Sequence, residues 1–263
     1  MQIKARYPTI QHERASKAIV EFFSDFREVE AVLLIGSCAR GKATSDSCLD
    51  FLVLLLPQVV STEKDLLEQK WEKYYQTEYI FKSLLQVGQY SHIDLEFKDG
   101  CFRPDRYPHG WTTGPDEFEL EIGNTLVYSK ALWEKGDYLE RLKAKWLPYY
   151  DEGLRQKRLD MVYQYCLNNI EHVPLYIDRK LYFQSFNRLY DALREFLQAL
   201  FIFHRTYPIA YDKWIKEQIV EILGKPELYP QLERILEINN FDGQEISDKA
   251  KDLHSLLKGC VRE

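Results

Sequence analysis

The stretch IGSCARGKATSDSCLDFLVLL, residues 35–55, follows one apolar run and leads into a second. Gly36, Gly41 and Lys42 fit the pattern G-x-x-x-x-G-K, in which backbone N–H groups hold phosphates at the start of a long helix. Two features contradict that interpretation. Ala43 replaces the Ser or Thr that the pattern requires, and only the six residues ATSDSC separate Lys42 from the next strand. A helix of ten residues needs about 15 Å along its axis, so none fits there.

A different pattern explains the same stretch without a gap. The sequence GSCARG at residues 36–41 is followed by a short spacer, and SCLD at residues 47–50 then opens an apolar strand. This resembles the signature of the polymerase-β-like nucleotidyltransferases, which is G-S-x-x-R-G, a short spacer and S-D-x-D entering a strand. Asp50 matches the second Asp of that signature, and Cys48 stands in place of the first.

The resemblance also implies a third carboxylate on a following strand. In SHIDLEF, residues 91–97, the polar side chains of His92, Asp94 and Glu96 alternate with apolar ones, so they share one face of a strand. Asp94 is the natural match, and Glu96 on the same face competes with it. The solvated face of an edge strand would show the same alternation, so the pattern alone leaves both interpretations open.

The chemistry of this family requires these residue types. Nucleotidyl transfer is an in-line attack on the α-phosphate of a nucleoside triphosphate, and Mg²⁺ or Mn²⁺ neutralises the phosphate oxygens and the leaving pyrophosphate. The resemblance implies Asp50 and Asp94 as metal ligands and Glu96 as a further catalytic carboxylate, with ATP or another nucleoside triphosphate as substrate. The nucleotide-binding residues that it implies are Gly36, Ser37, Arg40 and Ser47.

Cys48 is the departure from the family pattern that matters most. A thiol is a soft ligand and a poor one for Mg²⁺, so Asp50 and Asp94 remain for the metal. Asp46 lies on the loop and could reach the site only if the turn were remodelled. A base for the acceptor hydroxyl would come from Glu96 or from the DEFELE segment, which carries Glu117, Glu119 and Glu121.

The composition indicates a soluble globular protein. Of the 263 residues, 45% are hydrophobic and 29% charged, and no apolar run approaches the roughly 20 residues that cross a bilayer. The polar N-terminus lacks the apolar segment of a signal peptide, and the five cysteines form no C-x-x-C pair, so we expect a cytoplasmic location. A net charge of −6 argues against a general nucleic-acid binder. A homodimer is compatible with the sequence, although no feature indicates one.

The hydrophobic pattern divides the chain into two parts. Up to about residue 150, helices are expected over residues 10–27, 62–84 (capped by Ser61 or Thr62) and 134–150, and strands over residues 30–37, 49–57, 91–97 and 125–130. Beyond that point strand signals stop, and the clearest helix covers residues 181–205. We therefore expect an α+β protein with a nucleotidyltransferase domain at 1–140, formed by a small mixed sheet with flanking helices, and an all-α bundle at 141–263.

The helical part extends the resemblance in outline. Enzymes that adenylylate aminoglycosides or lincosamides, of the kanamycin nucleotidyltransferase type, join such a domain to a helical bundle on the acceptor side, and residues 186–215 resemble the helical domains of that class. The resemblance implies transfer of a nucleoside monophosphate, AMP from ATP, to a hydroxyl of a small molecule. Because of Cys48, the alternative is a catalytically degenerate module that binds nucleotide or protein, as in toxin–antitoxin or stress systems.

Overall fold

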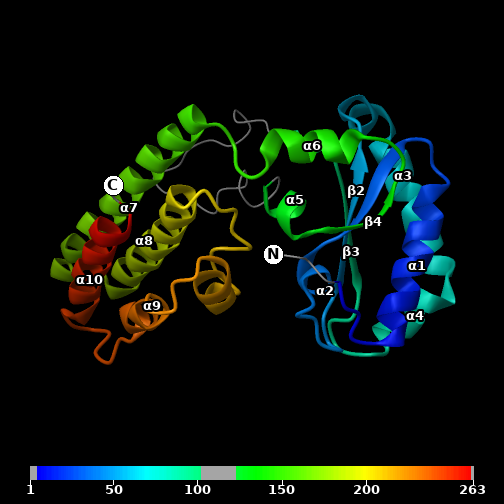
Figure 1. Cartoon of the computed structure of the whole chain (residues 1–263). Helices are drawn as coiled ribbons and strands as arrows, with labels where there is room; N and C mark the ends of the chain where they lie inside the picture. The colour runs from blue at the N-terminus through cyan, green and yellow to red at the C-terminus, as the bar shows by residue number, and fades with distance from the viewer. Residues whose placement is uncertain (1–4, 102–122, 262–263) are drawn as a thin grey trace. The chain divides into compact units, whose positions relative to one another are not determined.

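The computed structural model describes residues 5–101 and 123–261, and these form two compact units (Figure 1). The first unit combines residues 5–101 with Asn124–Leu147, and the second contains Gly123 and the chain from Pro148 onward. The division thus lies between Leu147 and Pro148, where the sequence suggested 140/141. Each unit has a hydrophobic core of its own.

The first unit is built on a mixed sheet of four strands within the described residues. In chain order the strands are β1 (Val29–Leu34), β2 (Leu49–Leu55), β3 (Ile93–Lys98) and β4 (Lys130–Glu134). Their order across the sheet is β3-β2-β1-β4, with β1 antiparallel to both of its neighbours and β2 parallel to β3. The expected α+β class, with a small mixed sheet and flanking helices, is confirmed.

One face of the sheet carries the main core of this unit. In β2 the side chains of Leu49, Phe51 and Val53 point to this face, because alternate residues of a strand share a side. Three helices cover it: α1 (Ile10–Ser24), α3 (Pro57–Thr77) and α4 (Tyr79–Leu85), as Figure 1 shows. Because neighbouring residues of a strand point to opposite sides, burial of Leu49 and Phe51 on this face turns the Asp50 side chain to the other face.

The opposite face carries shorter helices. These are α5 (Asn124–Tyr128) and α6 (Tyr138–Trp146), and α6 packs against β1. The short helix α2 (Gly36–Arg40) follows β1 and contributes Cys38 and Ala39 to the main core. Leu52 and Leu54 of β2 are buried on this face, 2% exposed each. Asp50, at the start of the same strand, is only partly buried. The sheet is therefore apolar over most of this side and polar at one end.

Two expectations for this unit were wrong in detail. The helix expected at 62–84 begins at Pro57, which occupies its first position, and the Ser61 and Thr62 hydroxyls donate to the Gln58 carbonyl inside the helix instead of capping it. The helix also breaks at Glu78, whose extended backbone separates α3 from α4. Residues 125–130, expected as a strand, form most of α5 and the first residue of β4.

The second unit is helical throughout its regular structure. Its elements are α7 (Glu152–Asp178), α8 (Tyr182–Phe203), the π-helix η3 (Glu217–Ile222), α9 (Tyr229–Leu236) and α10 (Glu245–Cys260). The helices α7 and α8 form an antiparallel hairpin, and the leucine and phenylalanine positions expected at helical spacing lie in its core. The expected helical part is confirmed.

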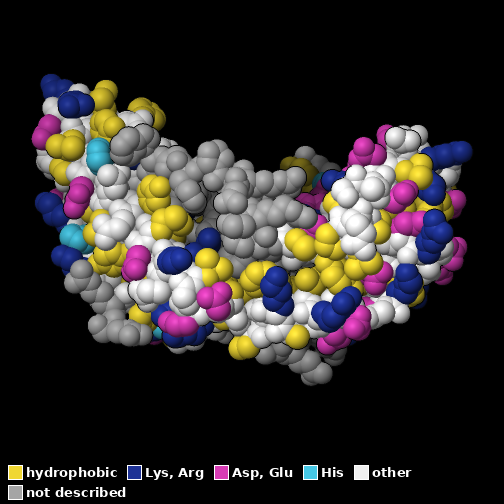
Figure 2. Space-filling view, turned by 90° about the horizontal axis from the view of Figure 1, so that it is seen from above, with side chains coloured by type: hydrophobic (Ala, Val, Ile, Leu, Met, Phe, Trp, Pro, Cys, Tyr) yellow, Lys and Arg dark blue, Asp and Glu magenta, His cyan; other side chains and the backbone are white. Residues whose placement is uncertain are grey.

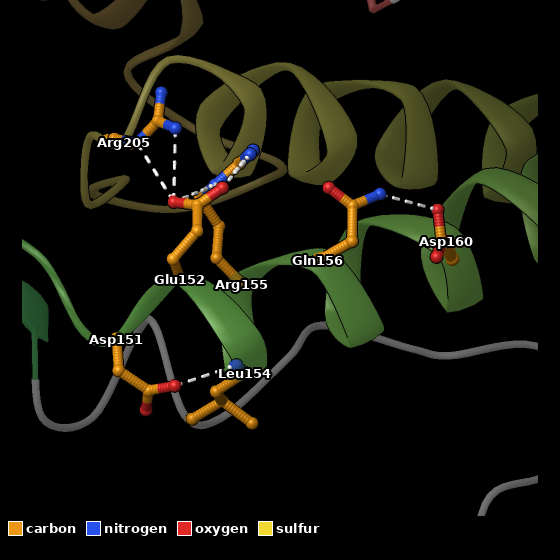
Figure 3. A network of polar contacts seen from close by, with 7 residues as sticks. All are labelled: Asp151, Glu152, Leu154, Arg155, Gln156, Asp160 and Arg205. Atoms are coloured by element: carbon orange, nitrogen blue, oxygen red, sulfur yellow. Dashed lines mark hydrogen bonds and ion pairs between the residues drawn. The ribbon is translucent and has the colours of Figure 1, made fainter.

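A polar network ties the start of α7 to the end of α8 (Figure 3). Asp151 caps α7 by accepting a hydrogen bond from the Leu154 N–H at 2.9 Å. Glu152 accepts from the buried Arg155, whose Nε lies 2.9 Å away, and from Arg205 at 3.0 Å. These bonds hold the pKa of Glu152 down to about 2, with Arg155 as the main cause.

Among the described residues, no helix is long and apolar enough to cross a membrane. On the face drawn in Figure 2, lysine and arginine side chains are interspersed with aspartate and glutamate instead of being separated by sign. This distribution agrees with the modest net charge of −6.

Candidate active site

The ends of three strands converge at one edge of the sheet. β1 runs antiparallel to β2, and β2 runs parallel to β3. The end of β1 and the beginnings of β2 and β3 therefore lie at the same edge of the sheet, with β2 in the middle. Asp50 and Asp94 are direct partners in the β2–β3 register. The Ile35 N–H, just after β1, donates to the Asp50 carbonyl at 3.0 Å. The topology thus brings together the two carboxylates that the sequence singled out.

Cys48, Asp50 and Asp94 form a compact group of potential metal ligands. One ligand atom from each, a sulfur and two carboxylate oxygens, lie within 4.8 Å of one another. Cys48 and Asp50 are partly buried, and Asp94 is exposed. Since Cys48 and Asp50 are two residues apart on one extended segment, their side chains point the same way.

Gly36 lies directly against the Asp50 carboxylate. Its φ of +67° is in the left-handed region, and a Cβ added there would be 1.9 Å from Asp50 Oδ2. Both the backbone conformation and the available space therefore require glycine. This close approach places the turn after β1, and the first backbone amides of α2, next to the carboxylates.

Cys48 interacts with Asp50 as a neutral thiol. Burial raises the pKa of Cys48 to about 12, and a hydrogen bond to Asp50 and the charges of Asp50 and Asp94 act in the same direction. Burial also raises the pKa of the neighbouring Cys38 to about 12. The two carboxylates are hard oxygen ligands suited to Mg²⁺, whereas a neutral thiol is not, so the donor set fits that ion in part.

His92 and Glu96 take different places on the same strand face. His92 Nε2 lies 3.2 Å from Asp94 Oδ2 and orients that carboxylate. Glu96 lies 2.8 Å from Lys98 Nζ and is not part of the ligand group around Asp50. Asp94, rather than Glu96, is therefore the carboxylate that the structure brings to Asp50.

The segment that carries these residues is similar to a known protein family. Residues 17–104 match the family model of the polymerase beta nucleotidyltransferase domain. The match covers about a third of the chain and includes β1, β2 and β3 with all three ligand residues. No curated protein matches the sequence.

The chain also matches several solved structures. One of them is the crystal structure of a nucleotidyltransferase-like protein from Exiguobacterium sibiricum 255-15, 14% identical, with a TM-score of 0.46. The alignment covers 94% of this chain and 74% of the other.

Within the segment that matches the family model, Arg40 is turned back onto its own loop. This side chain is 8% exposed, and Nη1 donates to the Gly36 carbonyl at 3.1 Å. Gly41, with φ of +72°, ends α2 in the left-handed conformation. Arg40, which the sequence indicated as a nucleotide contact, thus supports the conformation of Gly36.

Ser47 likewise shapes the loop that leads into β2. Its Oγ accepts a hydrogen bond from the Thr44 N–H at 2.9 Å. Its carbonyl accepts from His12 Nε2 at 3.0 Å, so that ring nitrogen carries the proton. The Ser47 hydroxyl, which the sequence predicted to bind nucleotide, is therefore hydrogen-bonded to the backbone in this structure.

His12 contacts the loop that leads into β2, and the sequence did not predict this contact. It is fully buried on α1, and its Nδ1 lies 2.8 Å from the Thr9 hydroxyl. His12, Ala15 and Ile19 follow one helical stripe at spacings of three and four, which could have identified His12 as inward-facing. Nothing in the sequence indicates its partner Ser47, because that contact spans 35 positions.

Asp46 and the DEFELE segment were the remaining candidate carboxylates. Asp46 accepts a long hydrogen bond of 3.4 Å from the Tyr90 N–H, and it is not part of the group formed by Cys48, Asp50 and Asp94. The candidate bases Glu117, Glu119 and Glu121 lie outside the described residues.

Proposed function

We propose that the chain is a metal-dependent nucleotidyltransferase that moves AMP from ATP to a hydroxyl group of a small molecule. The observation that carries the proposal is the pairing of Asp50 with Asp94 across β2 and β3, with Gly36 packed against the Asp50 carboxylate. Two carboxylates on adjacent parallel strands can share one divalent cation. The family match over residues 17–104 agrees with this chemistry.

In this mechanism each residue has a distinct task. Asp50 and Asp94 would hold the cation, which would supply neutralisation of charge on the triphosphate and on the leaving pyrophosphate. The backbone amides at Gly36 and Ser37 would bind the triphosphate, since Gly36 lets the backbone lie directly against the Asp50 carboxylate. Arg40 keeps that conformation through its bond to the Gly36 carbonyl.

The second unit is the proposed acceptor side. It contains a pocket of about 330 Å³ lined by charged, polar and aromatic side chains, among them Arg155, Asp160, Tyr163 and Phe203. Such a lining suits a hydroxylated molecule, which needs hydrogen-bonding groups of both kinds along with apolar contact. The pocket is therefore the part of the second unit that we propose for a small-molecule acceptor.

A second candidate function follows from Cys48. The thiol occupies the position of the first carboxylate and donates to Asp50, which favours a domain that binds nucleotide without transferring it. In that case the chain would act as a nucleotide-dependent interaction module. The two candidates differ in turnover and agree in nucleotide binding.

Pyrophosphate release separates these functions. We expect the native chain to release pyrophosphate from ATP with Mg²⁺ or Mn²⁺ and one member of a panel of hydroxylated acceptors. Asp50→Asn should lower the rate by about 100-fold or more, because loss of a metal ligand removes several kcal/mol of transition-state stabilisation. Asp65→Asn is the matched control, since Asp65 is exposed on α3, which covers the face of the sheet opposite to that of Asp50.

The outcomes are distinct. Turnover that disappears in Asp50→Asn and persists in Asp65→Asn supports the transferase. ATP binding without turnover, with turnover restored by Cys48→Asp, supports the second candidate. Equal rates in native chain and Asp50→Asn would contradict the proposed site, and absence of ATP binding would contradict both functions.

A further inference from the structure

We propose that Cys48, Asp50 and Asp94 form a site selective for a thiophilic divalent cation of the Zn²⁺ type over Mg²⁺. The inference concerns the metal of the reaction proposed above and rests on that proposal for its catalytic meaning. Ion binding itself can be measured without turnover. The starting observation is the Cys48 sulfur, which is the one donor of the group that does not suit Mg²⁺.

The chemistry of the three donors distinguishes the two ions. Mg²⁺ requires hard oxygen ligands in near-octahedral geometry and gains little from sulfur. Zn²⁺ accepts sulfur and carboxylate oxygen together, and three protein ligands leave its fourth position for water or substrate. One sulfur from Cys48 and one oxygen each from Asp50 and Asp94 make such a set.

The geometry of the group is compatible with tetrahedral coordination. With a metal–sulfur distance near 2.3 Å and a metal–oxygen distance near 2.0 Å, tetrahedral donors lie about 3.5 Å apart. The three ligand atoms already lie within 4.8 Å of one another, so side-chain movements of about an ångström bring them together. Cys48 Sγ faces the carboxylates, since the Cys48 thiol and the Asp50 side chain share a hydrogen bond.

The surroundings hold the two carboxylates in place. Gly36 packs against Asp50 Oδ2 on one side, and His92 Nε2 lies 3.2 Å from Asp94 Oδ2 on the other. A ring nitrogen bonded to a ligating carboxylate fixes its orientation and is a common support of metal sites. The group thus has two supported oxygens and one sulfur, which is more than an exposed acidic cluster.

Binding of the ion exchanges one proton for one metal bond. The Cys48 S–H bond breaks, a metal–sulfur bond forms, and the proton leaves to solvent, because thiolate is the ligating form. Both carboxylates bind through oxygen lone pairs without a change of oxidation state. No oxidant or reductant takes part.

Cobalt is the direct probe of the sulfur ligand. We expect Co²⁺ added to the full-length native chain to produce a thiolate-to-metal charge-transfer absorption band that Zn²⁺ displaces. Cys48→Ser should lose this band, while Cys260→Ser, a change on α10 of the second unit, should keep it. Circular dichroism of each variant checks that the fold is retained.

Cation selectivity is the second measurement. By titration calorimetry, Cys48→Asp should lower the ratio of Zn²⁺ affinity to Mg²⁺ affinity by about tenfold or more relative to the native chain. An unchanged ratio in Cys48→Asp, or a Co²⁺ band that survives in Cys48→Ser, would overturn the proposal.

These readouts separate this inference from the proposed function. A Co²⁺ band that depends on Cys48, in a chain without pyrophosphate release, supports the metal site and contradicts the transferase. Pyrophosphate release with Mg²⁺, in a chain that gives no Co²⁺ band, supports the transferase and contradicts the thiophilic site.

Discussion

At the scale of single residues, close packing around Asp50 determines what the site can hold. Gly36 leaves no room for a Cβ beside Asp50 Oδ2, and Cys48 shares a hydrogen bond with the same side chain. Arg40 adds a hydrogen bond to the Gly36 carbonyl from behind the loop. The Asp50 carboxylate therefore depends on two neighbours, Gly36 and Cys48, and on Arg40 through Gly36, and the motif GSCARG…SCLD supplies all three.

Replacement of Gly36 by alanine tests this packing. Gly36→Ala should weaken ATP binding in the presence of a divalent cation by about tenfold or more, because the new Cβ would displace the Asp50 carboxylate. Gly224→Ala is the matched control: its φ is +65°, but nothing lies within 4 Å of the added Cβ. It imposes the same backbone strain without the collision. Equal ATP affinities in the two variants, measured by titration calorimetry, would contradict the argument.

At the scale of elements, capping and ion pairing decide how the helices begin and end. Pro57 starts α3 four residues before the expected cap, since proline suits the first turn and the hydroxyls of Ser61 and Thr62 bond within the helix. In the second unit, Glu152 links the first turn of α7 to Arg205, just after α8. Such a link joins two ends that are 53 positions apart in sequence.

The ion pairs of Glu152 predict a dependence of stability on pH. The folded-state pKa is about 2, below the ordinary value of 4.5, so the stabilisation is complete above pH 4.5 and is lost as the pH falls toward 2. Glu152→Gln should remove this contribution and flatten the decline of the unfolding free energy between those pH values. Because Glu152 is exposed, added salt should reduce the difference between the native chain and the variant.

The exposed pair of Glu13 and Lys17 on α1 offers a control. Glu13→Gln breaks a surface pair at helical spacing, which contributes little to stability. Denaturant titrations at several pH values should therefore show the larger change for Glu152→Gln. A native chain and Glu152→Gln variant with parallel pH profiles would refute the assignment.

At the scale of the whole molecule, two separate cores stabilise the chain. The core of the first unit lies between the sheet and α1, α3 and α4, and that of the second lies among α7, α8, α9 and α10. Each unit closes its core with its own side chains, so damage to one core has its main effect within that unit. The candidate metal ligands belong to the first unit alone.

Two phenylalanines on α8 test the independence of the cores. Phe196 is 0% exposed, and Phe196→Ala should destabilise the second unit by about 3–5 kcal/mol, since it leaves a cavity. Phe183 is 83% exposed, and Phe183→Ala should cost about 1 kcal/mol or less. Hydrogen exchange should show loss of protection in α7 and α8 of Phe196→Ala while β1 and β2 remain protected. Equal loss in both units would show that they unfold together.

The sequence alone predicted the features of the candidate site that depend on neighbouring residues. The pattern of glycines, serines and Asp50 around residues 36–50, and the alternation that presents Asp94, predict the ligands and a mixed α+β domain. These signals are short-range, because strand alternation repeats every two residues and turn chemistry spans a few positions. The sequence did not predict the start of α3 at Pro57 or the break at Glu78, since capping competes with tertiary packing at helix ends.

By itself, then, the sequence determined the residue types at the candidate site, the first three strands and the helical character of residues beyond 150. Only the tertiary structure decided which of them meet. Asp94, instead of Glu96, pairs with Asp50 because β3 lies parallel to β2 in one register. His12 bonds the Ser47 carbonyl, 35 positions away, because packing of α1 against the sheet brings the two segments together. Such contacts depend on packing across the sheet, which no local pattern specifies.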